Sequence, residues 1–236
     1  MIFQTRFHHM IILGVITAAA AWSGQSSSAI SAAEPGSIRW HAQRAQEQGT
    51  TSITIPAPRG MFEKISSLDQ ALSTYHVVVG MPLASVTQVL DNNHVYTWYK
   101  LRILESLVPH PNPEVPAVSI PEAVLPIKAN EIVVHVPQGT VTVDGVRITV
   151  TDPDSRLLTL HEKYLFFLSP DSSGKFAYLR AGPNATFLIK PDNKIAPLVD
   201  TQSHMQVDLE ASTGGSLDSL RTFAKAKATE RLQQHN

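Results

Sequence analysis

The chain has 236 residues and a near-neutral charge, with 19 Lys and Arg against 20 Asp and Glu, and it contains no cysteine. This balance argues against a general binder of nucleic acid or of anionic membranes, because such proteins carry a clear basic excess. The lack of cysteine excludes a disulfide framework, a thiol nucleophile and a thiolate zinc site.

Residues 1–33 have the features of a secretory signal peptide. A start with one cation, Arg6, leads into an apolar run over 11–22, and small residues follow it. The run is shorter than the roughly 20 apolar residues that a membrane-spanning helix needs. Cleavage is expected after Ala29 or Ala33. We therefore predict a secreted or periplasmic protein that has no stable membrane insertion once the signal is removed.

Residues 34–72 are predicted to form a helical and extended lead-in. Ser37 can cap a short helix over 38–48, and Ser67 can cap a second one that ends near Leu72. The stretch between these helices is rich in Thr and Pro, which favours an extended conformation.

Residues 73–200 are predicted to form the main β domain. From Tyr75 onward the apolar pattern changes from a helical period to a period of two. In 94–107 the alternation is strict, so one face of the strand carries Tyr96, Trp98, Lys100 and Arg102. Six prolines in 108–129 prevent both a strand ladder and a helix, and we expect a long surface loop there.

A β-hairpin is predicted over 140–151. Asp144-Gly145 suits a two-residue type I′ turn, whose two positions need positive φ. The turn sets Val143 opposite Val146, and a shared apolar face follows from that register. We expect this face to line the interior of a barrel. Its residues are Val141, Val143, Val146, Ile148 and Val150.

Residues 201–236 are predicted to form a linker and a C-terminal helix. Ser216 can cap the helix, and Asp218 lies in its first turn, near the positive end of the helix dipole. The apolar stripe of the helix is thin. The helix can dock on the barrel or remain frayed, and this thin stripe favours fraying.

The order of elements resembles an OB-fold barrel of the netrin and tissue-inhibitor-of-metalloproteinases type, which also occurs in uncharacterised secreted bacterial proteins. The residues that carry the resemblance are 75–80, 98–104 and 162–168, and it covers about 67–199. It implies a mainly β protein with a small closed or partly open antiparallel barrel, short N-terminal helices and a C-terminal helix. The amino-terminal cysteine with which the inhibitors bind zinc has no counterpart here, so their activity is not implied.

The candidate ligand-binding residues are Tyr96, Trp98, Lys100 and Arg102. OB-type barrels often bind ligands on a comparable strand face. Aromatic rings can stack on sugars or bases, and the cations can hold phosphate or carboxylate groups. The alternative is that the lead-in helices or the Pro-rich loop cover these aromatic side chains as a second small core.

No catalytic, cofactor or metal motif is recognised. There is no Gly-x-Ser-x-Gly elbow, P-loop or dinucleotide fingerprint. His161-Glu162 begins like a zinc-protease signature, but Leu165 stands where the second histidine belongs. We predict no cofactor, no metal and no nucleic-acid partner.

The favoured function is a secreted, non-catalytic binding or interaction module for a protein or glycan of the cell envelope. One alternative is a hydrolase whose site uses some of His94, His135, His161 and Asp152. Another is an architectural envelope protein that assembles through its C-terminal helix.

Overall fold

The computed structural model describes residues 33–57, 65–109, 116–153, 156–179, 186–198 and 204–234. These residues are mainly β, with 42% strand and 26% helix, which confirms the predicted class. Nearly all of the predicted signal peptide, 1–32, lies outside the described residues. None of the helices in the described ranges is long and apolar enough to cross a membrane.

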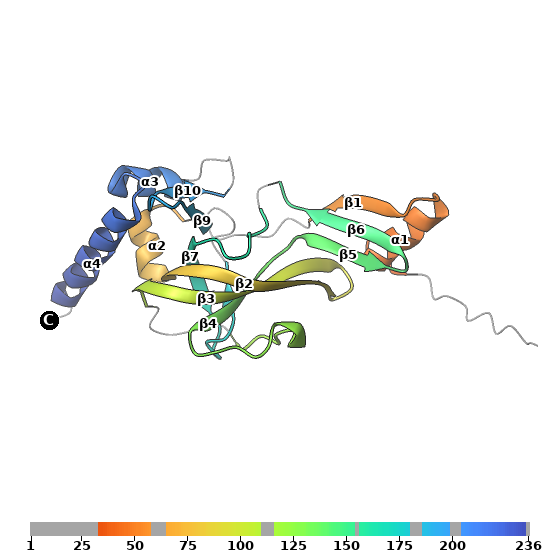
Figure 1. Ribbon diagram of the computed structural model, residues 1–236, viewed down its shortest axis with the longest axis horizontal. Helices are drawn as coiled ribbons and strands as arrows, with labels where there is room; N and C mark the ends of the chain where they lie inside the picture. Colours follow the sequence, from red (N-terminus) through yellow and green to blue (C-terminus); the bar gives the residue numbers. More distant parts are fainter. Residues whose placement is uncertain are drawn as a thin grey trace, which may run out of the picture. The chain divides into compact units, whose positions relative to one another are not determined.

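The larger of two sheets contains seven strands, and its neighbouring strands run antiparallel (Figure 1). β8 pairs with β7, outside the main strand order. That order is β10 (Ile195–Pro197), β9 (Thr186–Ile189), β7 (Tyr164–Pro170), β2 (His76–Leu90), β3 (His94–Val108) and β4 (Glu131–Val136), and β8 is Ala177–Tyr178.

The larger sheet is not closed into a barrel, so the expectation of a closed barrel is wrong. Val133 of β4 meets Phe176, the residue before β8, at an isolated parallel bridge instead of along a paired ladder. The Val133 N–H donates to the carbonyl oxygen of Lys175 at 2.8 Å beside this bridge. Five strands, β2, β3, β4, β7 and β8, nevertheless contribute to one buried apolar cluster. Its members include Tyr99, Leu101, Tyr164, Phe166 and Leu168.

The smaller sheet contains the predicted hairpin. β5 (Gly139–Val143) and β6 (Val146–Thr151) pair with Val143 opposite Val146, and Asp144 and Gly145 have φ of 49° and 82°. These values confirm the predicted turn and register. β1 (Ser52–Pro56) adds to β6 in parallel orientation.

The apolar face of the hairpin packs against helix α1 (Ile38–Glu47), so the prediction that it lines a barrel interior is wrong. Ile148 is fully buried in one cluster with Ile38 and Ala42 of α1 and with Val95 of β3. The Ile38 N–H also donates to the carbonyl oxygen of Asn92, at the tip of the β2–β3 hairpin, at 2.9 Å. A helix from the predicted lead-in therefore covers the face.

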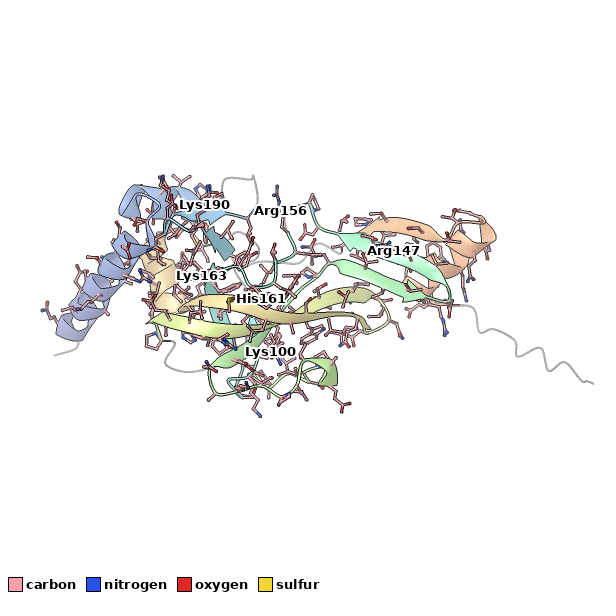
Figure 2. All side chains as sticks on the ribbon, viewed as in Figure 1. Lys100, Arg147, Arg156, His161, Lys163 and Lys190 are labelled. Atoms are coloured by element: carbon pink, nitrogen blue, oxygen red, sulfur yellow. The ribbon has the colours of Figure 1, made fainter. Side chains whose placement is uncertain are left out.

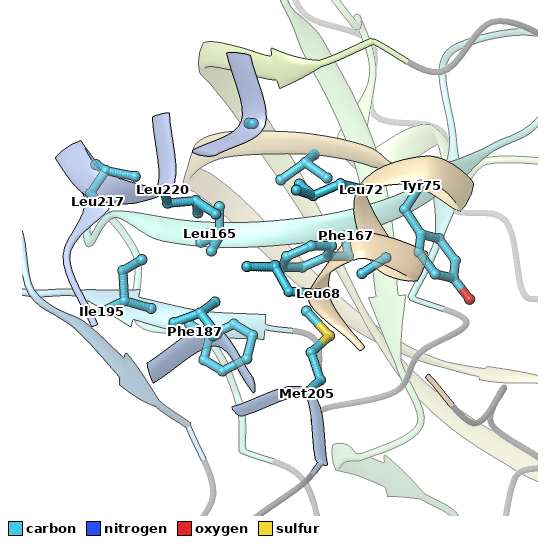
Figure 3. Packing of buried hydrophobic residues seen from close by; sticks show 14 of the residues in the cluster. Leu68, Leu72, Tyr75, Leu165, Phe167, Phe187, Ile195, Met205, Leu217 and Leu220 are labelled. Carbon is cyan, nitrogen blue, oxygen red and sulfur yellow. The ribbon is translucent and has the colours of Figure 1, made fainter. Parts of the chain in front are cut away.

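Three helices, α2 (Leu68–Thr74), α3 (His204–Thr213) and α4 (Leu217–Gln234), form a second core with β2, β7 and β9 (Figure 3). The cluster includes Leu68, Leu72, Phe167, Phe187 and Met205. Ser37 and Ser67 accept hydrogen bonds from the N–H groups of Trp40 and Gln70, both at 3.1 Å, which confirms the two predicted helix caps.

The first half of α4 is docked, and the favoured expectation of fraying is wrong for this half. Leu217, Leu220 and Ala224 are buried in the core shared with the other helices. Arg221 donates from Nε and Nη2 to the Glu105 carboxylate of β3 at 2.6–3.1 Å. Apolar burial and this ion pair together fix the helix to the sheet.

Candidate ligand-binding surface

The four residues of the predicted stripe lie on one face of β3, but they differ in exposure. Tyr96, Lys100 and Arg102 are half-buried, whereas Trp98 is only 1% exposed. Trp98 packs in one apolar cluster with Val133 of β4, Phe176 and residues of the Pro-rich segment 116–129. The segment contributes Val118, Ile120, Val124 and Ile127. The structure therefore agrees with the alternative prediction for Trp98, in which the Pro-rich segment covers the aromatic side chain.

Both ends of the Pro-rich segment are held by carboxylates. The Val118 N–H donates to Oδ2 of Asp171 at 2.8 Å, and the Lys128 N–H donates to Oε2 of Glu131 at 3.0 Å. Near the second end, Nζ of Lys100 donates to the carbonyl oxygen of Pro126 at 3.5 Å. Figure 2 shows Lys100 beside β3 on the side of this segment. Because Lys100 is engaged there, it holds the segment as well as belonging to the stripe.

The Asp171 carboxylate is fully buried and carries four hydrogen bonds. Besides the Val118 N–H, it accepts from the Ser173 hydroxyl at 2.7 Å, from the Ser173 N–H at 3.2 Å and from the Phe176 N–H at 3.3 Å. Burial alone would raise the pKa of Asp171, but the hydrogen bonds outweigh it and lower the pKa below its ordinary value. Asp171 therefore stays ionised at neutral pH and fixes the segment to the turn after β7.

An aromatic row lies on the same face, toward the start of β3. We define it by its four half-buried rings, which are His94, Tyr96, His135 and Tyr178. Successive ring centroids are 6.0, 4.4 and 6.1 Å apart. The rings come from β3, β4 and β8, and the stack of Tyr96 on His135 has an interplanar angle of 17°.

His135 is the centre of this arrangement. It lies opposite Trp98 in the β3–β4 register, and its ring centroid is 4.9 Å from that of Trp98 and 5.1 Å from that of Phe176. Burial among these rings lowers the pKa of His135 to about 4, so the imidazole is neutral at pH 7. Burial also raises the pKa of Tyr96, and the neighbouring charge of Asp91 adds to this. Tyr96 and His135 thus present uncharged rings at neutral pH.

Two polar atoms beside the aromatic row lack a partner. Within the described part of the chain, Nε1 of Trp98 and Nδ1 of His135 are buried and form no hydrogen bond. Buried polar groups in folded proteins are nearly always hydrogen-bonded, and an unpaired one costs about 1–3 kcal/mol. Two such atoms on adjacent rings mark this point as different from an ordinary core.

Sequence reasoning placed Tyr96 in the ligand stripe, named His94 and His135 only for the hydrolase alternative, and missed Tyr178. His135 and Tyr178 come from other strands, and only the β3–β4–β8 arrangement brings them to Tyr96. The signal for His135 was the alternation in 131–136, which places it on the face opposite Ile132 and Val134 of the buried cluster. For Tyr178, the two-residue strand β8 is too short to show a period.

The residues of the hydrolase alternative lie on different elements. His94 and His135 flank Tyr96 in the aromatic row, Asp152 follows β6, and His161 precedes β7. His161 has a φ of 68°, and its N–H donates to the carbonyl oxygen of Pro82 at 2.8 Å; Figure 2 shows it beside β2. Across the described ranges, no three His, Asp or Glu side chains are grouped so that they could hold a metal ion. The hydrolase stays a prediction without a defined site.

The comparisons with known proteins give no relative. The chain matches no family model, no curated protein and no solved structure at a significant level. The resemblance to the netrin type therefore stays a prediction, and the functional argument depends on the aromatic row itself.

Proposed function

We propose that this protein is a secreted or periplasmic, non-catalytic binding module, and that the aromatic row is its ligand surface. The observation that carries this proposal is the alignment of four half-buried rings across three strands, with unpaired polar atoms beside them. Binding sites are typically lined by aromatic side chains with a few placed polar groups. The partner is a protein or a glycan of the cell envelope.

The fold supports the position of this ligand surface on a strand face. We propose that β2, β3, β4, β7 and β8 form a partly open barrel of the OB type. Its support is the cluster that all five strands share and the bridge between Val133 and Phe176. OB-type barrels bind oligosaccharides and oligonucleotides on a strand face, and a near-neutral chain disfavours oligonucleotides. In this proposal β3 and β4 supply that face.

Capture from the envelope fraction of the native host tests the function. The immobilised full chain is compared with Tyr96→Ala and Tyr178→Ala, and Arg147→Ala is the control, because Arg147 is exposed on the smaller sheet. Stacking on one ring is worth about 1–3 kcal/mol, so each tyrosine variant is expected to retain the partner at least about fivefold less well. Equal retention by the tyrosine variants and the control would contradict the proposal.

A further inference from the structure

We propose that the ligand of the aromatic row is a neutral saccharide, one of whose hydroxyl groups pairs with Nε1 of Trp98 and Nδ1 of His135. This inference rests on the proposed function, because it names the ligand class of the same surface. Its basis is the hydrogen-bonding chemistry of the two unpaired atoms and the uncharged character of Tyr96 and His135.

The two unpaired atoms suit a hydroxyl group in either tautomer of His135, whereas a carboxylate suits them only when Nδ1 carries the proton, and an ammonium group cannot pair with Trp98. Trp98 Nε1 is a donor only, and in a neutral imidazole each ring nitrogen is either a donor or an acceptor. A hydroxyl group both donates and accepts, so it satisfies Trp98 together with His135 in either tautomer. A carboxylate or phosphate accepts only, and an ammonium group donates only.

The surroundings disfavour a charged ligand. Desolvating a charge without a counter-ion is costly, and His135 is neutral at pH 7 because of its burial. The nearest cation of the predicted stripe, Lys100, already donates to Pro126. A sugar ring instead offers an apolar C–H face that stacks on aromatic rings, together with hydroxyl groups at its edge. Both parts of a sugar therefore find partners here.

The Pro-rich segment controls access to the two atoms. Val118, Val124 and Ile127 of this segment pack in the cluster that buries Trp98. The described part of the segment belongs to no strand ladder. Its polar anchors, Asp171 and Glu131, lie at its two ends, and Lys100 adds one contact to Pro126 at 3.5 Å. The middle of the segment is thus held mainly by apolar contacts. The saccharide reaches Trp98 when residues 119–125 move outward, which leaves the contact of Pro126 with Lys100 in place.

Trp98 itself reports the predicted contact. In a full chain carrying Trp22→Phe and Trp40→Phe, Trp98 is the one tryptophan left. Chitohexaose and cellohexaose are titrated as neutral probes, and a hexagalacturonate is the charged counterpart. At least one neutral probe is expected to change the Trp98 emission saturably, and the charged probe is expected to bind at least about tenfold more weakly, a difference of about 1.4 kcal/mol.

Calorimetry with Trp98→Phe separates a ligand contact from a structural role. The phenyl ring preserves most of the packing but lacks the donor, so circular dichroism is expected to stay native while affinity for the probe falls about tenfold. Trp40→Phe, the matched exchange on α1, is expected to bind like the parent. Unchanged affinity in Trp98→Phe would overturn the inference.

The remaining outcomes separate this inference from the proposed function. If neither neutral probe binds at up to about 10 mM, a limit near −3 kcal/mol, the saccharide assignment fails. If capture of the native partner still depends on Tyr96 in that case, the binding function stands. If the hexagalacturonate binds as tightly as the neutral probes or more tightly, the preference for a neutral ligand is refuted.

Discussion

Replacement of His135 by Phe is expected to change how the stability of the protein depends on pH. Burial lowers the pKa of His135 from 6.5 to about 4 in the folded chain, so the unfolded chain binds more protons between these values. The free energy of unfolding therefore falls as the pH falls from 6.5 to 4. The shift of about 2.5 pH units corresponds to about 3 kcal/mol at 1.36 kcal/mol per unit. His135→Phe keeps an aromatic ring in the row and cannot titrate.

The assay is chemical denaturation of both proteins at pH 7, 6, 5 and 4. At pH 7 His135→Phe is expected to be at least as stable as the parent, because the variant no longer buries the unpaired Nδ1. Toward pH 4 the parent is expected to lose up to about 3 kcal/mol relative to the variant. Carboxylates that titrate in both proteins cancel in this difference. Parallel curves would refute the buried, neutral state of His135 and the tight ring packing that causes it.

Three further substitutions test the elements that position the row. Asp171→Ala removes the acceptor of four hydrogen bonds and is expected to cost about 2–4 kcal/mol at pH 7 in denaturation. The loss in free energy of unfolding is largest above 3.8, the pKa of Asp171 in the unfolded chain, and it shrinks as the pH falls through the lower pKa of the folded chain. A difference in stability between parent and variant that is the same at pH 2 as at pH 7 would contradict this prediction. Gly139→Ala, at a φ of 146°, places a Cβ against Oγ1 of Thr97, whereas the Cβ of Gly174→Ala meets nothing within 4 Å. The melting temperature of Gly139→Ala should therefore fall further, and equal losses would argue against close packing at the start of β5. Arg221→Ala removes a half-exposed ion pair, so we expect the free energy of unfolding to fall by at most about 1 kcal/mol, with faster amide hydrogen exchange in α4. Unchanged exchange would show that apolar contacts alone hold the helix.

Local features of the fold were predictable because the sequence signals for them are local. Asp144-Gly145 dictates a tight turn through its backbone angles, and the flanking alternation then fixes the register. The partner of the resulting apolar face was not predictable in this way. Alternation says which face is apolar, whereas α1 reaches it through the parallel pairing of β1 with β6. Parallel partners come from distant segments, and no short-range pattern identifies them.

The candidate site was predictable to the extent that it lies on one strand. Alternation placed Tyr96 and Trp98 on one face of β3, but it could not tell which of them is covered. Val118, Val124 and Ile127, which stand among or directly after the prolines of the loop, were the missed sign that this segment has an apolar surface of its own. The rest of the aromatic row depends on contacts between strands, so it emerges only from the tertiary structure.

The most direct test of the aromatic row as a ligand surface is photo-crosslinking in the native host. A benzophenone amino acid, p-benzoylphenylalanine, replaces Tyr178 in one full-length protein and Arg147 in another; the latter position is exposed on the smaller sheet. Benzophenones insert into C–H bonds of proteins and saccharides alike, so the readout does not presuppose the ligand class. Irradiation is expected to give a heavier adduct from position 178 and none from position 147. No adduct at either position, or equal adducts at both, would contradict binding at the row.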